Sequence, residues 1–331
     1  MNALYALIMV LALVIIPLLG AGALGWHVLF GVVLPYLAFT VFVLGFISKV
    51  VSWGRSAVPF KIPTTGGQQK SLPWIRQSRI DNPSSKFATV IRMILEILLF
   101  RSLFRNTRVR LFKDDTQLSY GSSKFLWLGA LAFHVSFFVI LARHMRFFTE
   151  PVPVVFSWLE NLDGIMQVGV PVLFATEIVI LLALAYLFLR RILVPQLRYI
   201  SLPTDYFALF LLFAIVISGI LMRYFIRADI MDIKVLTMGL IQFQPQIPES
   251  IGALFYTHLF LVCSLLVYFP WSKLMHLGGV FLTPTRNMPN DNRVRRHVNP
   301  WNYPVKLHTY EEWEDEYRDK LKEAGIPVEK E

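Results

Sequence analysis

Long apolar stretches with few charges constrain this chain more than any other feature of its sequence. Six of them approach or exceed the roughly 20 residues that an α-helix needs to cross a bilayer. They span residues 3–22, 28–48, 125–147, 165–189, 205–222 and 253–272. Only 16% of the 331 residues are charged, whereas an ordinary soluble domain has about a quarter. The sequence therefore predicts an all-α, integral membrane helical bundle of about six transmembrane helices.

The N-terminal segment and the single cysteine narrow the class of protein further. Residues 1–26 contain no charged side chain. A secretory signal carries basic residues before its apolar core, so we expect this segment to remain as a membrane helix. Cys263, inside the sixth stretch, is the only cysteine. One thiol excludes a disulfide within the chain and an iron–sulfur cluster ligated by this chain alone.

The positive charge is concentrated in one connection. Residues 52–124 contain thirteen Lys and Arg but four Asp and Glu, so this loop holds nine of the ten excess positive charges. Such a loop suits anionic lipid headgroups or a docked partner rather than nucleic acid. Because basic connections stay in the cytoplasm, this loop, residues 190–203 and the C-terminal tail are predicted to be cytoplasmic. Residues 149–163 and 223–251 then face outside. We expect a multi-pass protein of the cytoplasmic (inner) membrane of a prokaryote, with both termini in the cytoplasm.

Four of the seven histidines belong to two of the apolar stretches or their ends, two with the third stretch and two with the sixth. Ionisable residues are costly inside a bilayer and are therefore functional candidates. His134 and His144 would lie about 15 Å apart along a helix, with azimuths that differ by about 80°, so both can face the bundle interior. His258 and His276 are eighteen residues apart, which is five helical turns and places them on one face.

The predicted topology matches these histidines in depth. The third stretch runs outward and the sixth inward, so His134 and His276 lie toward the cytoplasm, while His144 and His258 lie toward the outside. Two imidazoles on facing helices can hold one low-spin haem b, which transfers electrons. The sequence thus predicts two haem b groups. The alternatives are a single haem, or histidines that only form hydrogen bonds between helices.

His276 is the least secure of the four predicted ligands. A straight helix would separate it from His258 by about 27 Å, whereas the two histidines of the third stretch are about 15 Å apart. Pro270 lies between His258 and His276, and a kink there could shorten the rise and turn His276 inward.

Charged residues near the predicted outer pair are further candidates. Arg143 and Arg146 flank His144 and suit the propionate carboxylates of a haem, although their alternative role is to extend toward the membrane surface. Glu177 falls inside the fourth stretch, where a carboxylate must be protonated or paired, and a role in a proton path is open.

The four histidines, ten apart and then eighteen apart, resemble those of the di-haem cytochrome b subunit of respiratory nitrate reductase over about residues 123–277. The resemblance implies that His134 and His276 hold the inner haem, and His144 and His258 the outer haem. The additional N-terminal stretch, the basic loop and the tail GGVFLTPTRNMPNDNRVRRHVNPWN are similar to DsrM/HmeC-type cytochrome b subunits of the DsrMKJOP membrane redox complex.

This second resemblance covers nearly the whole chain and carries functional implications. It implies that the chain passes electrons between menaquinol and a cytoplasmic iron–sulfur subunit (DsrK-like) in the dissimilatory sulfur metabolism of sulfate-reducing prokaryotes, as part of a complex with further subunits. Menaquinol is then expected near the outer haem. Candidate residues for the quinone site or proton path, chosen by location, are Arg146, Glu150, Glu160 and Asp163, and the acids among these could instead be solvated loop residues. Glu177, inside the fourth stretch, is a further candidate for the proton path.

Two other classes of function compete with an electron carrier. A haem-free membrane anchor subunit or a secondary transporter would also be an apolar helical bundle. Neither explains four histidines matched in depth, and a bound chromophore would discriminate against both.

The chain is divided on these grounds into four regions. Residues 1–50 form an N-terminal transmembrane helix pair. Residues 51–122 form a basic cytoplasmic loop in which segment 87–100 is an amphipathic helix at the membrane surface or against a partner. Residues 123–277 form a four-helix di-haem cytochrome b domain. Residues 278–331 form a cytoplasmic tail that is expected to dock the partner together with the basic loop.

Overall fold

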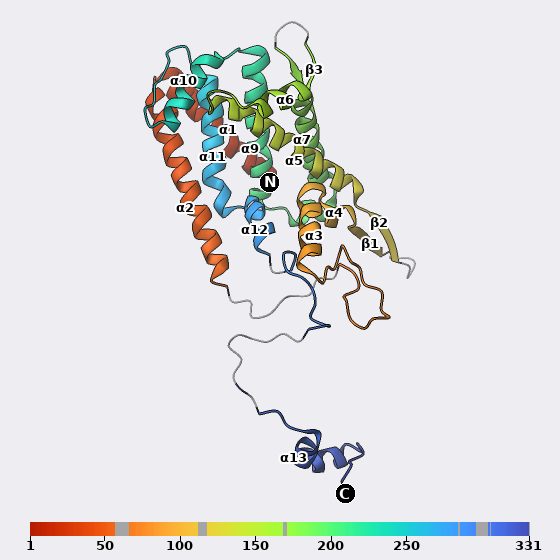
Figure 1. Cartoon of the computed structure of the whole chain (residues 1–331). Coiled ribbons are helices and arrows are strands. Elements are labelled where there is room, and N and C mark those ends of the chain that lie inside the picture. The colour runs from red at the N-terminus through yellow and green to blue at the C-terminus, as the bar shows by residue number, and fades with distance from the viewer. Residues whose placement is uncertain are drawn as a thin grey trace.

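A computed structural model describes residues 1–56, 66–111, 118–167, 171–283, 285–295, 304 and 306–330. Parts of the predicted docking segments, in the basic loop and in the tail, lie outside the described residues. Within the described residues, the chain forms the predicted mostly helical bundle, with long helices side by side (Figure 1).

Five helices of the described residues are long and apolar enough to cross a membrane, which confirms a multi-span membrane bundle. A short π-helical or 3-10 turn extends each of them. They are α1 (Asn2–Pro17) with η1 (Leu18–Ala23), η2 (Leu29–Val33) with α2 (Leu34–Gly54), α5 (Lys124–His144) with η3 (Met145–Phe147), α9 (Pro203–Ile220) with η4 (Leu221–Phe225), and α11 (Ala253–Tyr268) with η5 (Phe269–Trp271).

The fourth predicted stretch begins later than expected. Its helix, α7 (Ala175–Leu193), is preceded by a short antiparallel pair, β3 (Gly164–Met166) and β4 (Leu173–Phe174). Pro171 disfavours helix for the residue before it, which hydropathy alone does not register. α7 carries Glu177 and two arginines, so it is more charged than the other five helices, but it packs along α5 and α9 in the same bundle.

Three clusters of buried apolar residues hold the bundle together. One joins α1, α9 and α11 through Val10, Leu211 and Leu261. A second joins α7 to α9 and includes Leu184. The third lies around Tyr256, at the end of the bundle that is predicted to face outside and is here called the outer end; there α11 meets the turn between α1 and α2 and the short helix α10 (Ile230–Ile241).

The N-terminus lies at the same end of the bundle as the connection between α7 and α9. Asn2 donates a hydrogen bond from Nδ2 to the Ser201 carbonyl at 2.9 Å, just after the short helix α8 (Pro195–Ile200). This neighbourhood agrees with the prediction that both segments lie on one side of the membrane.

The basic loop contains the predicted amphipathic helix. It is α3 (Lys86–Leu99), which begins at a Ser85 cap and ends at Phe100 in the left-handed conformation. α4 (Arg101–Phe104) follows, and then a hairpin of β1 (Thr107–Leu111) and β2 (Leu118–Ser122), which hydropathy did not predict. Trp127 Nε1 donates to the Leu99 carbonyl at 2.6 Å and ties this region to α5.

At the outer end, α6 (Val154–Asp163) covers the connection between α5 and α7. After α11 the chain forms η5 (Phe269–Trp271), η6 (Lys273–Met275) and α12 (His276–Leu282). The last helix, α13 (Tyr310–Glu323), starts with a Thr309–Glu312 capping box. The Glu314 carboxylate accepts the backbone amides of Glu329 and Lys330, which hold its pKa below the usual range.

The contact between α5 and α7 depends on Gly129. A Cβ atom there would lie 2.5 Å from Cδ1 of Tyr186 on α7. We expect Gly129→Ala to separate the two helices and to destabilise the protein by about 1–3 kcal/mol, as overpacking does. Thermal unfolding in detergent measures this loss. Gly54→Ala, where a Cβ would meet nothing within 4 Å, is the matched control, and an equal melting temperature for both variants would contradict the packing argument.

Candidate functional site

The four histidines of the apolar stretches meet as two pairs. The His134 and His276 ring centroids lie 5.9 Å apart, with the ring planes at 82°. The His144 and His258 centroids lie 6.4 Å apart, with the planes at 15°. These are the pairs predicted from topology. His134 and His144 both belong to α5, so the pairs stand at two depths, about 15 Å apart along that helix.

A break in the sixth helix brings His276 to His134. α11 ends at Tyr268, because Pro270 lacks an amide hydrogen and cannot continue the helix. Ser272 is extended, its hydroxyl accepts the Leu274 amide at 3.1 Å, and α12 begins at His276. The five helical turns counted between His258 and His276 are therefore not continuous, because the helix breaks at Pro270. The expected effect of Pro270, a shorter rise, is what the structure shows.

Each of the four rings is fixed through its Nδ1 atom. His134, His144 and His276 contact the backbone carbonyls of Ala130, Ile140 and Lys273 at 2.8, 2.7 and 2.8 Å. His258 Nδ1 contacts the Ser218 hydroxyl at 2.9 Å, and that hydroxyl in turn donates to the Ile215 carbonyl at 2.9 Å. A carbonyl can only accept, so Nδ1 carries the proton and Nε2 keeps its lone pair.

The Nε2 atoms are the ones left for a ligand. Within the described residues, the structure records no hydrogen bond to Nε2 of any of the four rings. His27 contrasts with them, since its Nε2 contacts the Ala21 carbonyl at 2.9 Å and its ring stacks on Tyr256 at 5.1 Å. A donor set anchored through Nδ1 is typical of metal-ligating histidines.

The pairs fit a haem better than a bare metal ion. In the part of the chain that the structure describes, no group of three or more His, Cys, Asp or Glu side chains could hold a metal by itself. Haem supplies its own in-plane nitrogens and needs two axial ligands. An iron about 2 Å from an imidazole nitrogen on each side, the distance imidazole keeps from a bound transition metal, sets the ring centroids about 6 Å apart. The observed 5.9 and 6.4 Å match this spacing.

The two pairs have different surroundings. Phe100 and Phe133 each pack edge-on to the His134 ring with centroids 5.0 Å away, while His276 is exposed. At the outer pair Gly219 faces His258, where a Cβ would lie 3.4 Å from Cε1. The backbone of α9 therefore approaches the His258 ring closely.

A buried charge network adjoins the outer pair. Arg143, the residue before His144, pairs with Asp163 and, through Nη2, with Glu177 at 3.1 Å. Its guanidinium lies 3.4 Å from the Phe174 ring centroid. Asp163 also accepts the Thr176 amide at 2.9 Å. The guanidinium of Arg143, which the sequence predicted as a partner of a haem propionate, is thus in contact with the carboxylates of Asp163 and Glu177.

Two members of this network were not predicted from the sequence. Arg223 lies 4.1 Å from the Phe174 ring centroid and 3.9 Å from Glu177, and Tyr224 donates to Glu177 Oε2 at 2.6 Å. Both lie in η4, at the outer end of α9. A signal existed, because the predicted topology places residues 223 and 224 at the same depth as His144.

The other predicted acids are also paired. Arg146 donates through Nη1 to both carboxylate oxygens of Glu160, at 2.7 and 2.8 Å. Glu150, which is exposed, pairs with Lys234 of α10. Asp163 is buried, so the alternative of a solvated loop acid does not describe it. Glu177 is mostly buried and paired, which is one of the two states expected for a carboxylate inside the fourth stretch.

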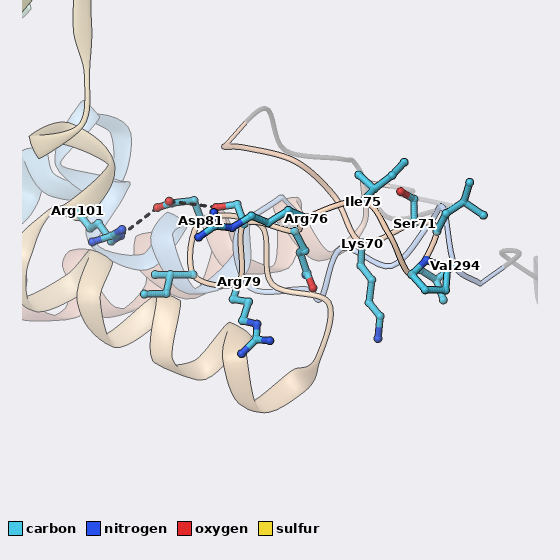
Figure 2. Close-up of a pocket in the computed structure, with 13 residues that line it drawn as sticks. Lys70, Ser71, Ile75, Arg76, Arg79, Asp81, Arg101 and Val294 are labelled. Atoms are coloured by element: carbon cyan, nitrogen blue, oxygen red, sulfur yellow. Dashed lines mark hydrogen bonds and ion pairs between the residues drawn. The ribbon is translucent and has the colours of Figure 1, made fainter.

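A hollow of the described surface lies in the basic loop, and none of the paired histidines lines it (Figure 2). Lys70, Arg76 and Arg79 line it, and Asp81 accepts a hydrogen bond from Arg101 at 3.0 Å at its edge. It is open and cationic, which suits a docked anionic surface rather than a small apolar ligand.

Comparison with known proteins agrees with the geometry. A family model described as nitrate reductase gamma subunit matches residues 90–296, which include all four paired histidines. The Hdr-like menaquinol oxidoreductase cytochrome b-like subunit of Archaeoglobus fulgidus is 48% identical over 281 residues, covering 83% of each chain. The protein of the same description from Archaeoglobus profundus is 48% identical over 275 residues, covering 81% of each chain.

The buried network makes a specific stability prediction. Arg143→Met would leave Asp163 and Glu177 without their shared cation, which we expect to destabilise the protein by about 3–5 kcal/mol. Arg146→Met removes a more exposed pair with Glu160 and should cost about 1 kcal/mol or less. Thermal unfolding of both variants in the same detergent measures the difference. Equal losses would show that the Arg143 network does not support the outer end.

Proposed function

The chain belongs to the nitrate reductase gamma subunit family, and we propose that it is a membrane cytochrome b that carries electrons from menaquinol to a cytoplasmic partner subunit. The observation that carries this proposal is the pair of facing imidazoles at each of two depths, each ring anchored through Nδ1. The inner haem b is assigned to His134 and His276, and the outer haem b to His144 and His258. When bound, haem supplies one-electron chemistry; the protein fixes its position and its electrostatic surroundings.

Menaquinol is proposed to be oxidised at the outer end. Oxidation of one quinol releases two electrons and two protons, so a proton acceptor is needed close to the outer haem. Glu177 is the group assigned to this role, because its carboxylate contacts Arg143 and Arg223 and accepts a hydrogen bond from Tyr224 close to the outer histidine pair. Asp163, Glu160 and Glu150 lie further along the outer end and are proposed to receive the protons next.

The cations of the outer end have a second proposed role. Arg143 and Arg146 stand on either side of His144, where they can serve the propionates of the outer haem. Each arginine would then contact a propionate as well as the carboxylates that it already pairs with.

The partner is proposed from the relatives and from charge. The two archaeal relatives are described as subunits of Hdr-like menaquinol oxidoreductases. The finer assignment is a DsrM/HmeC-type subunit of a DsrMKJOP-like complex in dissimilatory sulfur metabolism, with a DsrK-like iron–sulfur subunit as electron acceptor. Residues 52–124 and 280–305 would dock it on the cytoplasmic side, and the cationic hollow of Figure 2 supports this role.

The haem assignment predicts a simple stoichiometry. The purified protein should contain two haem b groups per chain by reduced-minus-oxidised and pyridine haemochrome spectra. His144→Ala or His258→Ala should remove the outer haem, and His134→Ala or His276→Ala the inner one, so that each variant retains one. His27→Ala and His308→Ala are controls that should retain both.

The alternatives would be recognised in the same experiment. Folded protein that was produced with haem available but binds none would support a haem-free anchor or a transporter. One haem in the unmodified chain, unaffected by His276→Ala, would remove the inner pair from the ligand set.

The proton-acceptor role predicts a kinetic defect. Glu177→Gln keeps the hydrogen bond from Tyr224 but removes the base, and should slow reduction of the haems by a menaquinol analogue by about 10²–10⁴-fold, as loss of a general base does. Reduction by dithionite should be unchanged. Glu249→Gln, which changes an exposed acid in the connection between α10 and α11 that has no proposed role, is the control. Wild-type rates in Glu177→Gln would place the acceptor elsewhere.

A further inference from the structure

Helix α3 has its polarity reversed relative to a helix on a water-facing surface. Phe87 and Leu98 are 76% and 63% exposed, whereas Thr89 and Arg92 on the opposite face are 3% and 9% exposed. A helix in water does the opposite and buries its apolar face. α3 stands beside the inner end of the bundle (Figure 1). Its outward face therefore suits lipid, and its inward face is polar.

Arg92 on this inward face lacks a counterion of its own. Its Nη1 atom is buried and has no hydrogen-bond partner among the described residues. Glu96, one turn later, is already engaged: Oε1 accepts from Arg286 at 3.0 Å, and Oε2 accepts from the backbone amide and hydroxyl of Ser102 at 2.9 and 2.6 Å. The cluster thus has two guanidinium groups for one carboxylate. A buried cation is costly unless an anion reaches it.

The inward face of α3 lies next to the elements that carry the inner histidine pair. Residues 92 and 96 are one turn apart on this face of the helix. Phe100, the residue that caps the helix, packs on the His134 ring with centroids 5.0 Å apart. Arg286, which contacts Glu96, follows α12, the helix that begins at His276.

We propose that Arg92 binds a propionate carboxylate of the haem held by His134 and His276. The inference rests on the proposed haem function. A haem propionate would need a cationic partner near the inner histidine pair, and Arg92 lies one turn before Glu96, which contacts Arg286 just after the helix that begins at His276. A guanidinium presents a fork of donors that fits a carboxylate. Glu96 acts as a positioning residue, because its bonds to Arg286 and Ser102 leave the Arg92 Nη1 atom free.

Potentiometric titration of the full-length, haem-loaded protein tests this assignment. Use of the His144→Ala background leaves the inner haem as the single signal. There, Arg92→Gln should lower the midpoint potential, because loss of a nearby cation favours the more positive, oxidised haem. We expect about a tenfold change in the reduction equilibrium, equivalent to about 59 mV for one electron. Arg92→Lys keeps the positive charge, so its midpoint potential should stay close to that of the parent protein.

Two further variants separate electrostatics from disruption of the fold. Glu96→Gln removes the competing carboxylate and should raise the potential of the same haem, a change of opposite sign that damage to the structure would not produce. If Arg92→Gln does not fold, this variant decides the question. Arg101→Gln removes a cation of α4 that pairs with Asp81, and should leave the potential unchanged.

Several results would overturn the proposal. An unchanged inner potential in Arg92→Gln or Glu96→Gln would do so, as would a shift confined to the outer haem. Loss of copurified anionic phospholipid from Arg92→Gln, without a potential shift, would assign the site to a lipid phosphate instead. Absence of haem from the unmodified protein would refute the proposed function itself, and is distinguishable because no potential could then be measured.

Discussion

The distance between the two histidine pairs depends on where the sixth transmembrane helix stops. An unbroken helix would carry His276 about 27 Å from His258, although their partners on α5 are about 15 Å apart. Pro270 ends α11 and the following turns remove this mismatch. Gly45 of α2 provides the space, because a Cβ there would lie 2.8 Å from the Pro270 ring. The inner site is therefore shaped jointly by a proline on one helix and a glycine on another.

The rings are oriented by two different means. His134 and His144 bond to the carbonyls four residues earlier, so α5 alone orients both rings wherever the helix forms. His258 relies on Ser218 of α9, and its orientation requires that α9 and α11 pack together. The outer pair thus depends on assembly of the bundle, which fits its enclosure by α7, α9 and the network around Glu177. The inner pair has an exposed member, His276, at the end where the partner is proposed to dock.

The sequence predicted those features that follow from periodicity and depth. Apolar length gave the bundle, and loop charge combined with histidine spacing gave the two pairs that the structure brings together. Hydropathy could not register the start of α7 after Pro171 or the short hairpins, because strand pairing over a few residues leaves no strong apolar pattern. Nor could it join Arg143 to Arg223 and Tyr224, because these contacts arise from packing between helices far apart in sequence. The sequence also could not predict that the polar face of α3 points inward, because an amphipathic pattern does not say which face of a helix is buried.

The two ends of the bundle differ in the net charge near their histidine pairs, and the inner end is the more positive. At the outer end Arg143 and Arg223 are matched by Asp163 and Glu177, so the net charge near that histidine pair is close to zero. At the inner end, within the part of the chain that the structure describes, the buried Arg92 and the partly exposed Arg286 lie beside one carboxylate, Glu96, which leaves an excess positive charge. A positive excess stabilises a reduced haem relative to an oxidised one, because reduction adds an electron in a medium that screens charges weakly. Electrons that enter at the outer pair would then move toward the inner pair, the direction that oxidation of quinol outside and reduction of a cytoplasmic partner requires.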